Sequence, residues 1–276
     1  MKRSRPEGLL ARRDLLVNLT LRELRGKYKR SALGWAWSMI NPIATMLIFT
    51  LVFKVLLKLP NPIGNPSGLQ VFALFLLCGL LPWNFLANSL SGSVTSLVGN
   101  AGLIKKVYFP RSVLPAASVL SWVVHLLIEL GILSIAMMLF GNFVLPWLPV
   151  AILIVVLQTI FVMGVGLGLS AINVYFRDVE HFLGIFILLW FYSSPIIYPA
   201  SLIPDSRVIL GMKVPIKAIL DLNPMVHFIG AYRAVFYDLR MPDARSIAFM
   251  VGYAALSFTL GWTLFNRLQK RFAEEL

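Results

Sequence analysis

Five stretches of the sequence, each 21 to 47 residues long, contain no charged side chain. An α-helix needs about 20 apolar residues to cross the roughly 30 Å hydrocarbon core of a bilayer, so each stretch is long enough to span one. The backbone groups of a spanning segment must find their hydrogen bonds within the protein, which favours helices for runs of this kind. The sequence therefore predicts an all-α integral membrane protein.

The boundaries within the two longest stretches follow from turn residues and from side-chain polarity. Residues 59–104 are strongly apolar only over 69–91, because their tail consists of small and polar residues. Farther along, Gly141-Asn142 and Pro146-Trp147 indicate a turn between two helices. Six transmembrane helices are predicted, over residues 34–57, 69–91, 112–140, 148–173, 182–199 and 246–266.

The composition agrees with this fold class. The chain has 58% hydrophobic and 13% charged residues, whereas a soluble domain has about 25% charged residues. An ordinary soluble domain is therefore excluded, and intrinsic disorder is disfavoured. Cys78 is the one cysteine of the chain, so a disulfide framework and a metal site built from cysteines are excluded as well.

The net charge of +13 is distributed unevenly between the two predicted faces. Of the 25 Lys and Arg residues, 17 lie before the first helix, in the loops 92–111 and 174–181, or after the last helix. The other face holds six, all in the segment 200–245, besides two lysines at the end of the first helix. Cytoplasmic loops carry the excess of basic residues, so both termini are predicted to be cytoplasmic. We expect one transmembrane domain over residues 1–276.

Residues 9–30 combine apolar and basic side chains in a helical pattern. On a helical wheel the apolar side chains fall in one narrow sector and most cations lie away from it: Leu10, Val17, Leu21, Leu24 and Tyr28 against Arg12, Arg22, Lys29 and Arg30, with Arg25 nearer the edge. This pattern predicts an amphipathic helix in the membrane interface, with its cations toward anionic head groups. A solvated basic arm that only fixes the topology is the alternative interpretation. Nucleic-acid binding is disfavoured, because the lipid surface is a nearer polyanion.

The third predicted helix carries polar groups at membrane depth. Trp122, His125 and Glu129, with Ser118 before them, follow helical spacing and share one face. A carboxylate at this depth is costly unless it faces the bundle interior, water or a partner, and His125 lies one turn away. Either these side chains line a hydrated translocation path, or they form a buried pair that fixes helix packing.

Small residues four positions apart mark two other predicted helices. Gly164 and Gly168 lie in the fourth helix, and Ser257 and Gly261 lie in the sixth. Such faces permit close approach of two helices, either in the protomer core or between subunits.

The outer segment 200–245 contains two further helical patterns, over 215–222 and 224–239, and each starts at a proline. Both are too short to span the bilayer, so they are predicted to be re-entrant or interfacial helices on the outer side, before the last span. Aromatic residues gather at this end, among them Tyr192, Tyr198 and Tyr232. They form either an interfacial belt or part of an exit path on which sugar rings stack.

Motifs of several enzyme classes are absent from the sequence. It has no G-x-x-x-x-G-K-[ST] phosphate loop, no H-E-x-x-H and no G-x-S-x-G. Asp178, Glu180 and His181 are close in sequence, but helical spacing brings only Asp178 and His181 near one face, so a metal site is not expected. The chain is therefore predicted to be a membrane pathway with no catalytic residues, no metal and no cofactor of its own.

Five segments, in this order, carry a resemblance to a known family: RELRGKYKRSALGWAWSMINP at 22–42, KKVYFPR at 105–111, NVYFRD at 173–178, SPIIYP at 194–199 and LNPMVHFIGAYR at 222–233. The chain resembles the type 2 ATP-binding-cassette permeases that export cell-surface polysaccharides, namely the O-antigen, capsule, teichoic acid and galactan exporters. The resemblance covers about residues 15–240.

The resemblance implies a permease of the bacterial cytoplasmic membrane that moves a lipid-linked glycan. Its partners would be a second copy of itself, membrane lipids and two copies of a separate ATPase subunit that binds ATP and magnesium. The N-terminal helix would be a gate helix, where the lipid head group meets Arg22, Arg25, Tyr28, Lys29 and Arg30. The loop 92–111 would contain the coupling helix, and the ATPase contacts would be Lys105, Lys106, Arg111, Arg177 and Asp178. The path would run along Trp122, His125, Glu129, Tyr192, Tyr198 and Tyr232.

Two other functions fit parts of the pattern. A permease of the same superfamily could carry a lipid or a drug instead of a glycan. A membrane-embedded transferase acting on a polyprenyl-linked sugar would need acids near a membrane face, and Asp178 and Glu180 are the internal candidates. The basic interfacial helix and the outer aromatic residues favour the glycan exporter.

Overall fold

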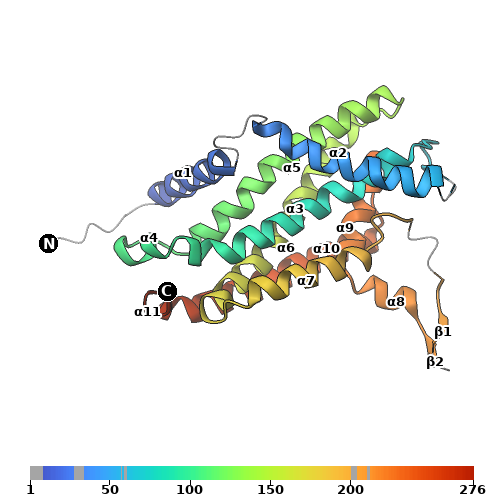
Figure 1. Cartoon of the computed structure of the whole chain (residues 1–276). Helices are drawn as coiled ribbons and strands as arrows, with labels where there is room; N and C mark the ends of the chain where they lie inside the picture. Colours follow the sequence, from blue (N-terminus) through green and yellow to red (C-terminus); the bar gives the residue numbers. More distant parts are fainter. Residues whose placement is uncertain (1–8, 28–33, 57, 59–60, 200–203, 210–211) are drawn as a thin grey trace.

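The computed structural model of the chain describes residues 9–27, 34–56, 58, 61–199, 204–209 and 212–276. Most of this part consists of helices that run between two ends of the molecule (Figure 1). Among the described residues, five helical segments are long and apolar enough to cross a membrane: Met39–Leu56, Phe72–Gly99, Val113–Leu139, Leu145–Tyr175 and Ala244–Glu275. They coincide with five of the six predicted spans, so this part of the fold prediction is confirmed.

The first elements in the chain lie at different depths of the bundle. In order they are α1 (Leu9–Lys27), η1 (Gly34–Ala36), α2 (Trp37–Thr50), the π-helical turn η2 (Leu51–Leu56), α3 (Phe72–Gly99) and α4 (Ala101–Lys106). Most side chains of α3 are buried, whereas nearly all described side chains of α2 are exposed or half-buried in the protomer. The helix α3 is therefore central and α2 peripheral. The second span is also longer than predicted, because the small and polar residues after Leu90 continue the helix to Gly99.

A tight turn joins the third and fourth spans. The helix α5 (Val113–Leu139) is followed by Gly141, whose φ of +92° is a left-handed conformation that glycine adopts at little cost. The 3₁₀ turn η3 (Leu145–Trp147), with a proline near its start, then leads into α6 (Leu148–Tyr175). The turn predicted from Gly141 and Pro146 is therefore confirmed.

The fifth predicted span, over residues 182–199, is only partly helical. The helix α7 (Val179–Tyr192) has 14 residues, and at 1.5 Å per residue its length is about 21 Å, shorter than the hydrocarbon core. The helix ends before Pro195, because proline disfavours the helical conformation of the residue before it and cannot donate a backbone hydrogen bond. A sixth full-length spanning helix is thus not confirmed, although α7 does run from one end of the bundle toward the other (Figure 1).

The segment between α7 and the last span contains a hairpin that the sequence did not predict. Strands β1 (Arg207–Ile209) and β2 (Met212–Val214) pair antiparallel, a small exception to the predicted all-α fold. The helices α8 (Ile216–Asp221) and α9 (Pro224–Tyr232), the latter continuing into the π-helical turn η5 (Arg233–Asp238), agree with the two predicted short helices. Their re-entrant position in a membrane stays a prediction.

The last span packs along α6. It consists of α10 (Ala244–Leu268), η6 (Gln269–Arg271) and α11 (Phe272–Glu275). A Cβ atom added to Gly164 would collide with the backbone of Ser257, and one added to Gly261 would collide with the backbone of Gly164. The Ser257 hydroxyl donates a hydrogen bond to the Phe161 carbonyl at 3.1 Å. The small residues of the two helices therefore meet inside the protomer, which decides between the two locations left open by the sequence.

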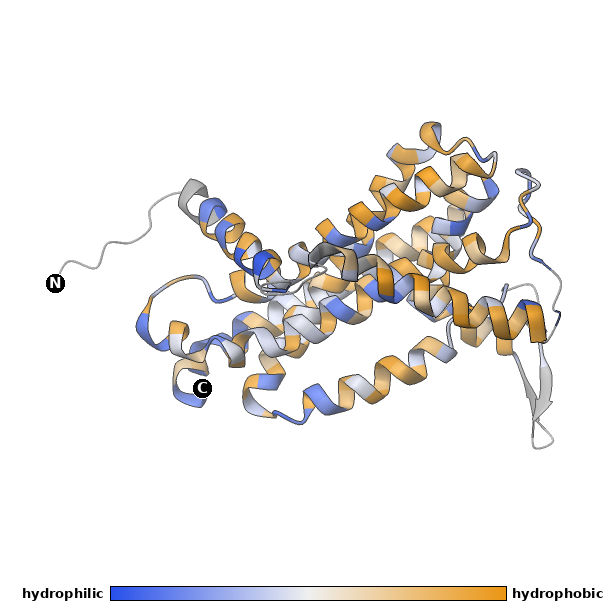
Figure 2. Cartoon of the chain, turned by 45° about the horizontal axis from the view of Figure 1, so that its top comes forward, coloured by the Kyte–Doolittle hydropathy of each residue, from blue (hydrophilic) through white to orange (hydrophobic). Residues whose placement is uncertain are grey.

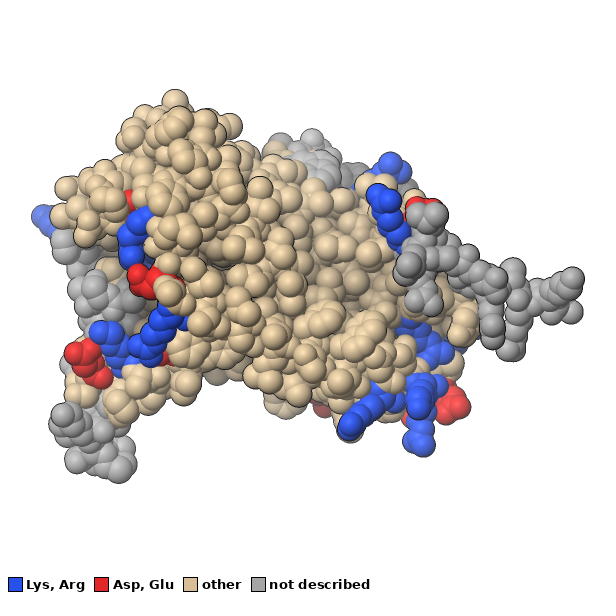
Figure 3. Space-filling model, turned by 180° about the vertical axis from the view of Figure 1, so that it is seen from behind, with Lys and Arg blue, Asp and Glu red and all other residues tan. Residues whose placement is uncertain are grey.

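Charged side chains gather at the two ends of the molecule. Figure 2 shows hydrophobic residues along the middle of the helices, and Figure 3 shows a broad uncharged band between the charged ends of one face. The helices α1, α4 and α11 and the α6–α7 turn all lie at one end, which we call the terminal end (Figure 1). The opposite end, with α8 and the hairpin, we call the far end. This grouping agrees with the predicted topology, while the cytoplasmic location of the terminal end stays a prediction.

Candidate functional site

A lysine at the end of α1 holds this helix against α5. The Lys27 ammonium donates a hydrogen bond to the Ser121 hydroxyl at 2.8 Å and lies 3.2 Å from the centroid of the Trp122 ring. Burial lowers the pKa of Lys27 to about 7, while the Glu23 carboxylate acts in the opposite direction. A cation over an indole face is also attracted by the charge distribution of the ring. The contact therefore joins the terminal-end helix to the polar face of a spanning helix.

The predicted apolar stripe of α1 is divided between the bundle and the outside of the protomer. Leu24 of the stripe is buried, together with Leu19 and the partly buried Leu16, whereas Val17 and Leu21 of the stripe are exposed. The prediction of a helix is thus confirmed. The exposed pair Val17 and Leu21 leaves α1 with apolar surface that suits a membrane interface, which supports the interfacial position without testing it.

The predicted head-group residues lie along the exposed side of α1. The Arg22 guanidinium donates to the side-chain oxygen of Asn100 at 2.8 Å and to the Glu23 carboxylate at 3.2 Å. Arg25 is exposed. Tyr28, Lys29 and Arg30 lie outside the described residues. Arg22 therefore links α1 to the residue between α3 and α4, while Arg25 is accessible from outside.

The predicted coupling residues occupy two exposed segments of the terminal end (Figure 1). Lys105 and Lys106 are exposed at the end of α4, and Arg177 and Asp178 are exposed in the turn between α6 and α7. Arg111 differs from these four, because it is half-buried and contacts the C-terminal segment of the chain. The two segments are thus accessible to a partner from the same end.

The residues predicted to line a path share one face of α5, and this face is turned toward the bundle. Trp122 is half-buried, and His125 and Glu129 are buried. The His125 ring places Nδ1 2.8 Å from the Ser121 carbonyl oxygen, and its centroid is 4.9 Å from that of Trp122. Ser121 thus contacts both Lys27 and His125, and Glu129 lies one helical turn farther along. The shared face is confirmed, while the role of these side chains in transport stays a prediction.

The three predicted tyrosines have different surroundings. Tyr192, which ends α7, is 63% exposed, and the Tyr198 hydroxyl donates to its carbonyl oxygen at 3.3 Å. Tyr232 is completely buried in α9 and donates to the side-chain oxygen of Gln158 at 3.0 Å. A ring with no exposed surface packs the interior of the protomer, so Tyr232 is not included in the path proposed below.

A buried arginine at the far end was not selected from the sequence. The Arg233 guanidinium donates to the carbonyl oxygens of Pro195 and Ile196, both at 2.6 Å, and lies 3.6 Å from the centroid of the Phe75 ring. Gly79 faces it so closely that a Cβ atom there would be 3.2 Å from Nη2. Arg233 therefore fastens the turn after α7 to η5 and to the central helix α3.

An asparagine makes a second link to the same turn. The side-chain oxygen of Asn223 accepts from the Trp190 indole at 2.7 Å and from the backbone N–H of Met225 at 3.0 Å. Its side-chain nitrogen donates to the Ser194 hydroxyl at 2.9 Å. The residue therefore caps α9 and holds the end of α7 at once. An asparagine directly before a helix-starting proline was the signal that could have identified it.

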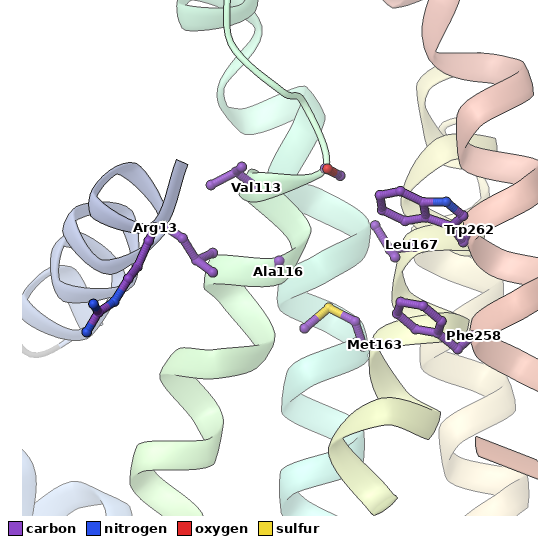
Figure 4. A pocket seen from close by; sticks show the side chains of 9 residues that line it. Arg13, Val113, Ala116, Met163, Leu167, Phe258 and Trp262 are labelled. Carbon is purple, nitrogen blue, oxygen red and sulfur yellow. The ribbon is translucent and has the colours of Figure 1, made fainter. Parts of the chain in front are cut away.

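A cavity of about 380 Å³ lies between α1, α5, α6 and α10. Figure 4 shows the apolar side chains that surround it, which are Val113, Ala116, Met163, Leu167, Phe258 and Trp262. Arg13 also lines it, but its guanidinium points away from the other labelled side chains. Within the described residues, the side chains that line the cavity therefore direct no charge into it.

The acidic residues that start α7 lie at the surface. Asp178, Glu180 and His181 are all exposed. Within the part of the chain that the structure describes, no three side chains of His, Cys, Asp or Glu are grouped so that they could hold a metal ion.

Comparison with known proteins gives a match over nearly the whole chain. Residues 14–237 match the family described as ABC-2 type transporter. The chain is 32% identical over 269 residues to the O-antigen export system permease protein RfbA of Myxococcus xanthus, with 96% of each chain covered. It is 33% identical over 265 residues to a protein of the same name from Klebsiella pneumoniae, with 95% of each chain covered. The polysialic acid transport protein KpsM of Escherichia coli is 22% identical over 249 residues, which are 90% of this chain and 91% of that protein.

Proposed function

The chain belongs to the ABC-2 type transporter family, and from this premise we propose that it is the transmembrane subunit of an ATP-driven polysaccharide exporter. It moves a lipid-linked cell-surface glycan from the cytoplasmic to the outer side of a bacterial cytoplasmic membrane. The observation that carries this proposal is the similarity, over nearly the full length of both chains, to permeases named for O-antigen export.

In this proposal two copies of the chain act with two copies of a separate ATPase subunit, which binds the ATP and magnesium. A size argument supports the dimer, because one bundle of six or fewer spanning helices rarely encloses a path wide enough for a sugar chain. Of the 25 Lys and Arg residues, 17 belong to the termini and to the loops 92–111 and 174–181. This excess over the other face supports a cytoplasmic location for α1, α4 and α11.

The anionic head group of the substrate meets the basic side chains of the N-terminal segment. Arg22 and Arg25 of α1 are the candidates within the described residues, and Lys29 and Arg30, with the neutral Tyr28 beside them, lie outside the described residues. Lys27 joins this group, because its ammonium is the link between α1 and the Trp122 ring. A diphosphate that draws Lys27 away from Trp122 releases α1 from α5, so head-group binding and movement of the gate helix are coupled.

The glycan then passes along the polar face of α5 and leaves near the end of α7. Half-buried Trp122 supplies the accessible part of this face, and the buried His125 and Glu129 join the path when the helices around α5 move apart. Tyr192 and Tyr198 offer rings at the far end. Aromatic rings and small polar groups let a sugar chain slide, because none of them holds it as tightly as a deep pocket would.

ATP binding closes the two ATPase subunits, and this motion is transmitted to the permease through its two exposed segments. Lys105 and Lys106 on α4, with Arg177 and Asp178 in the α6–α7 turn, are the proposed contacts. The motion is a rigid-body rotation of the two bundles, since packed helices shift as units.

Depletion of the protein from its native cell tests the proposal. Finished lipid-linked glycan is expected to accumulate in the cytoplasmic leaflet, and an ATPase subunit is expected to purify with the tagged chain. Accumulation of short precursors would instead support the transferase, and absence of any bound ATPase would contradict the exporter.

Two variants sharpen the test, because Asp178→Asn is expected to lower export while Glu180→Ala leaves glycan synthesis and export unchanged.

A further inference from the structure

The C-terminal segment of the chain is anchored in the terminal end by one buried aromatic side chain. Phe272, in α11, has no exposed surface, and its ring centroid is 5.5 Å from that of Phe265 and 6.3 Å from that of Tyr175. The guanidinium of Arg111 lies 5.9 Å from the same ring. Phe272 is the one buried residue of α11, so this helix is anchored to the bundle through that side chain.

The same segment contacts both of the exposed parts that are proposed to meet the ATPase. On one side, Arg111 of the coupling loop donates a hydrogen bond to the Gln269 carbonyl oxygen. On the other side, the hydroxyl of Tyr175, just before the α6–α7 turn, donates to the Leu268 carbonyl oxygen at 2.9 Å. Phe272 lies between these two links and belongs to the same apolar cluster as Ile104 of α4.

Apolar side chains next to these anchors point outward. Val107, Tyr108 and Phe176 are 52%, 90% and 68% exposed, and they lie beside the charged side chains of Lys106 and Arg177. Exposed apolar and aromatic residues mixed with charges are typical of a surface that binds another protein. The surface is divided between two segments about 70 residues apart in the sequence, with the C-terminal segment packed behind both.

We propose that residues 268–276 form a brace that joins the coupling loop and the α6–α7 turn into one docking surface for the ATPase subunit. This inference rests on the proposed function, because it concerns the partner of that function. Phe272 and Arg111 are then positioning residues: neither touches substrate, and both set the spacing between the two contacts. Without the brace, the two segments move independently of each other, and the motion of the ATPase subunit is transmitted to only part of the helix bundle.

Distances between spin labels in the full-length chain, with its ATPase bound, test the brace. One pair carries Gly102→Cys on α4 and Glu180→Cys after the turn, and a control pair at the far end carries Lys217→Cys and Asp243→Cys. All four positions are exposed, whereas Cys78 is completely buried, so the added thiols are the accessible ones. Phe272→Ala is expected to broaden the 102–180 distribution and to leave the 217–243 distribution unchanged.

Transport in vesicles that contain the complex gives the functional readout. Phe272→Ala is expected to lower the amount of glycan moved per ATP hydrolysed by roughly fivefold, while Phe272→Leu restores most of it and the exposed neighbour variant Glu274→Ala resembles the unmodified chain. An unchanged 102–180 distribution, or equal broadening of both pairs, overturns the brace. If the unmodified complex moves no glycan, the proposed function fails, whereas a normal complex with an unaffected Phe272→Ala variant rejects the brace alone.

Discussion

The ammonium group of Lys27 lies 3.2 Å from the centroid of the Trp122 ring, and this pair joins α1 to the polar face of α5. The same ammonium donates to the Ser121 hydroxyl, whose residue also presents its carbonyl oxygen to His125. One side chain of α1 thus connects directly to the residues proposed to line the path. Movement of α1 and access to the α5 face are therefore expected to change together.

Removal of the Lys27 amino group, which bonds Ser121 and lies over the Trp122 ring, is expected to loosen α1. Lys27→Met eliminates the hydrogen bond to Ser121 and the contact with Trp122, which should weaken docking by roughly 1–2 kcal/mol. Hydrogen exchange of the amides of residues 9–27, measured by mass spectrometry in lipid nanodiscs, should become about tenfold faster. Lys27→Arg keeps a donor for Ser121 and a group that stacks on the Trp122 ring, so it should retain part of the protection, although its charge stays buried at every pH.

Arg25→Met is the matched control for this exchange measurement, because Arg25 is on the same helix but exposed. Its α1 amides should exchange as in the unmodified chain. If the amide hydrogens of α1 exchange equally slowly in Lys27→Met and in Arg25→Met, Lys27 does not hold the helix.

Docking of α1 should strengthen as the pH rises above neutrality. Burial lowers the pKa of Lys27 from 10.5 to about 7, so the undocked helix binds more protons than the docked one between these two values. Docking is therefore least favourable below pH 7, improves through the window up to pH 10.5 by at most about 1.4 kcal/mol per pH unit, and is constant above it. The attraction between Trp122 and the cation reduces the slope.

Spin labels on two exposed positions, Asn18→Cys in α1 and Ile135→Cys in α5, provide the measurement. The population at the docked distance should grow between pH 7 and pH 10, and Lys27→Met should show no such growth. A docked population in the unmodified chain that is independent of pH over this range contradicts the prediction.

The spans were predictable because one physical requirement, an uncharged run long enough for the bilayer, acts on each segment separately. Two features depend on more than one segment and were missed. The length of α7 is limited by the turn at Pro195, which a count of uncharged residues ignores. The packed side of α1, for which the helical wheel made no prediction, depends on the polar face of α5, which accepts Lys27.

The candidate site likewise combines features that one segment determines with features that depend on several segments. The shared face of Trp122, His125 and Glu129 follows from helical spacing within one element, and the structure reproduces it. The clamp of Arg233 on Pro195 and Ile196 joins positions more than 35 residues apart through backbone carbonyls. Carbonyl oxygens are present at every residue, so no sequence pattern identifies which of them an arginine will reach.

Close contact between α6 and α10 should make one glycine irreplaceable. A Cβ atom on Gly261 would collide with the backbone of Gly164, so Gly261→Ala must push the helices apart and is expected to cost about 1–3 kcal/mol. Gly252→Ala on the same helix is the control, because no atom lies within 4 Å of its added Cβ. The unfolding midpoint in detergent should fall for Gly261→Ala and stay equal or rise for Gly252→Ala, whereas equal midpoints would contradict the helix contact.

Loss of the Arg233 clamp should release the turn after α7. Arg233→Met leaves the carbonyl oxygens of Pro195 and Ile196 buried without their donor, which is expected to cost about 2 kcal/mol or more. Arg233→Lys should recover only part of this, because one ammonium cannot reproduce the planar fork that reaches both oxygens. Arg240→Met removes an exposed arginine from surface ion pairs with Asp238 and Asp243, so it should change stability by less than about 1 kcal/mol.

Cysteine accessibility in the turn separates release of the clamp from general unfolding. The side chain at position 194 is buried in the unmodified fold. A water-soluble maleimide should therefore label Ser194→Cys slowly, both alone and combined with Arg240→Met, and quickly when it is combined with Arg233→Met. A thiol at Ser134, which is buried in the second half of α5, should stay protected in all of these variants, since the spanning helices do not depend on the clamp. Fast labelling at position 194 together with protection at 134 assigns Arg233 to the turn, whereas labelling at both positions shows that Arg233 supports the whole bundle and contradicts a local clamp.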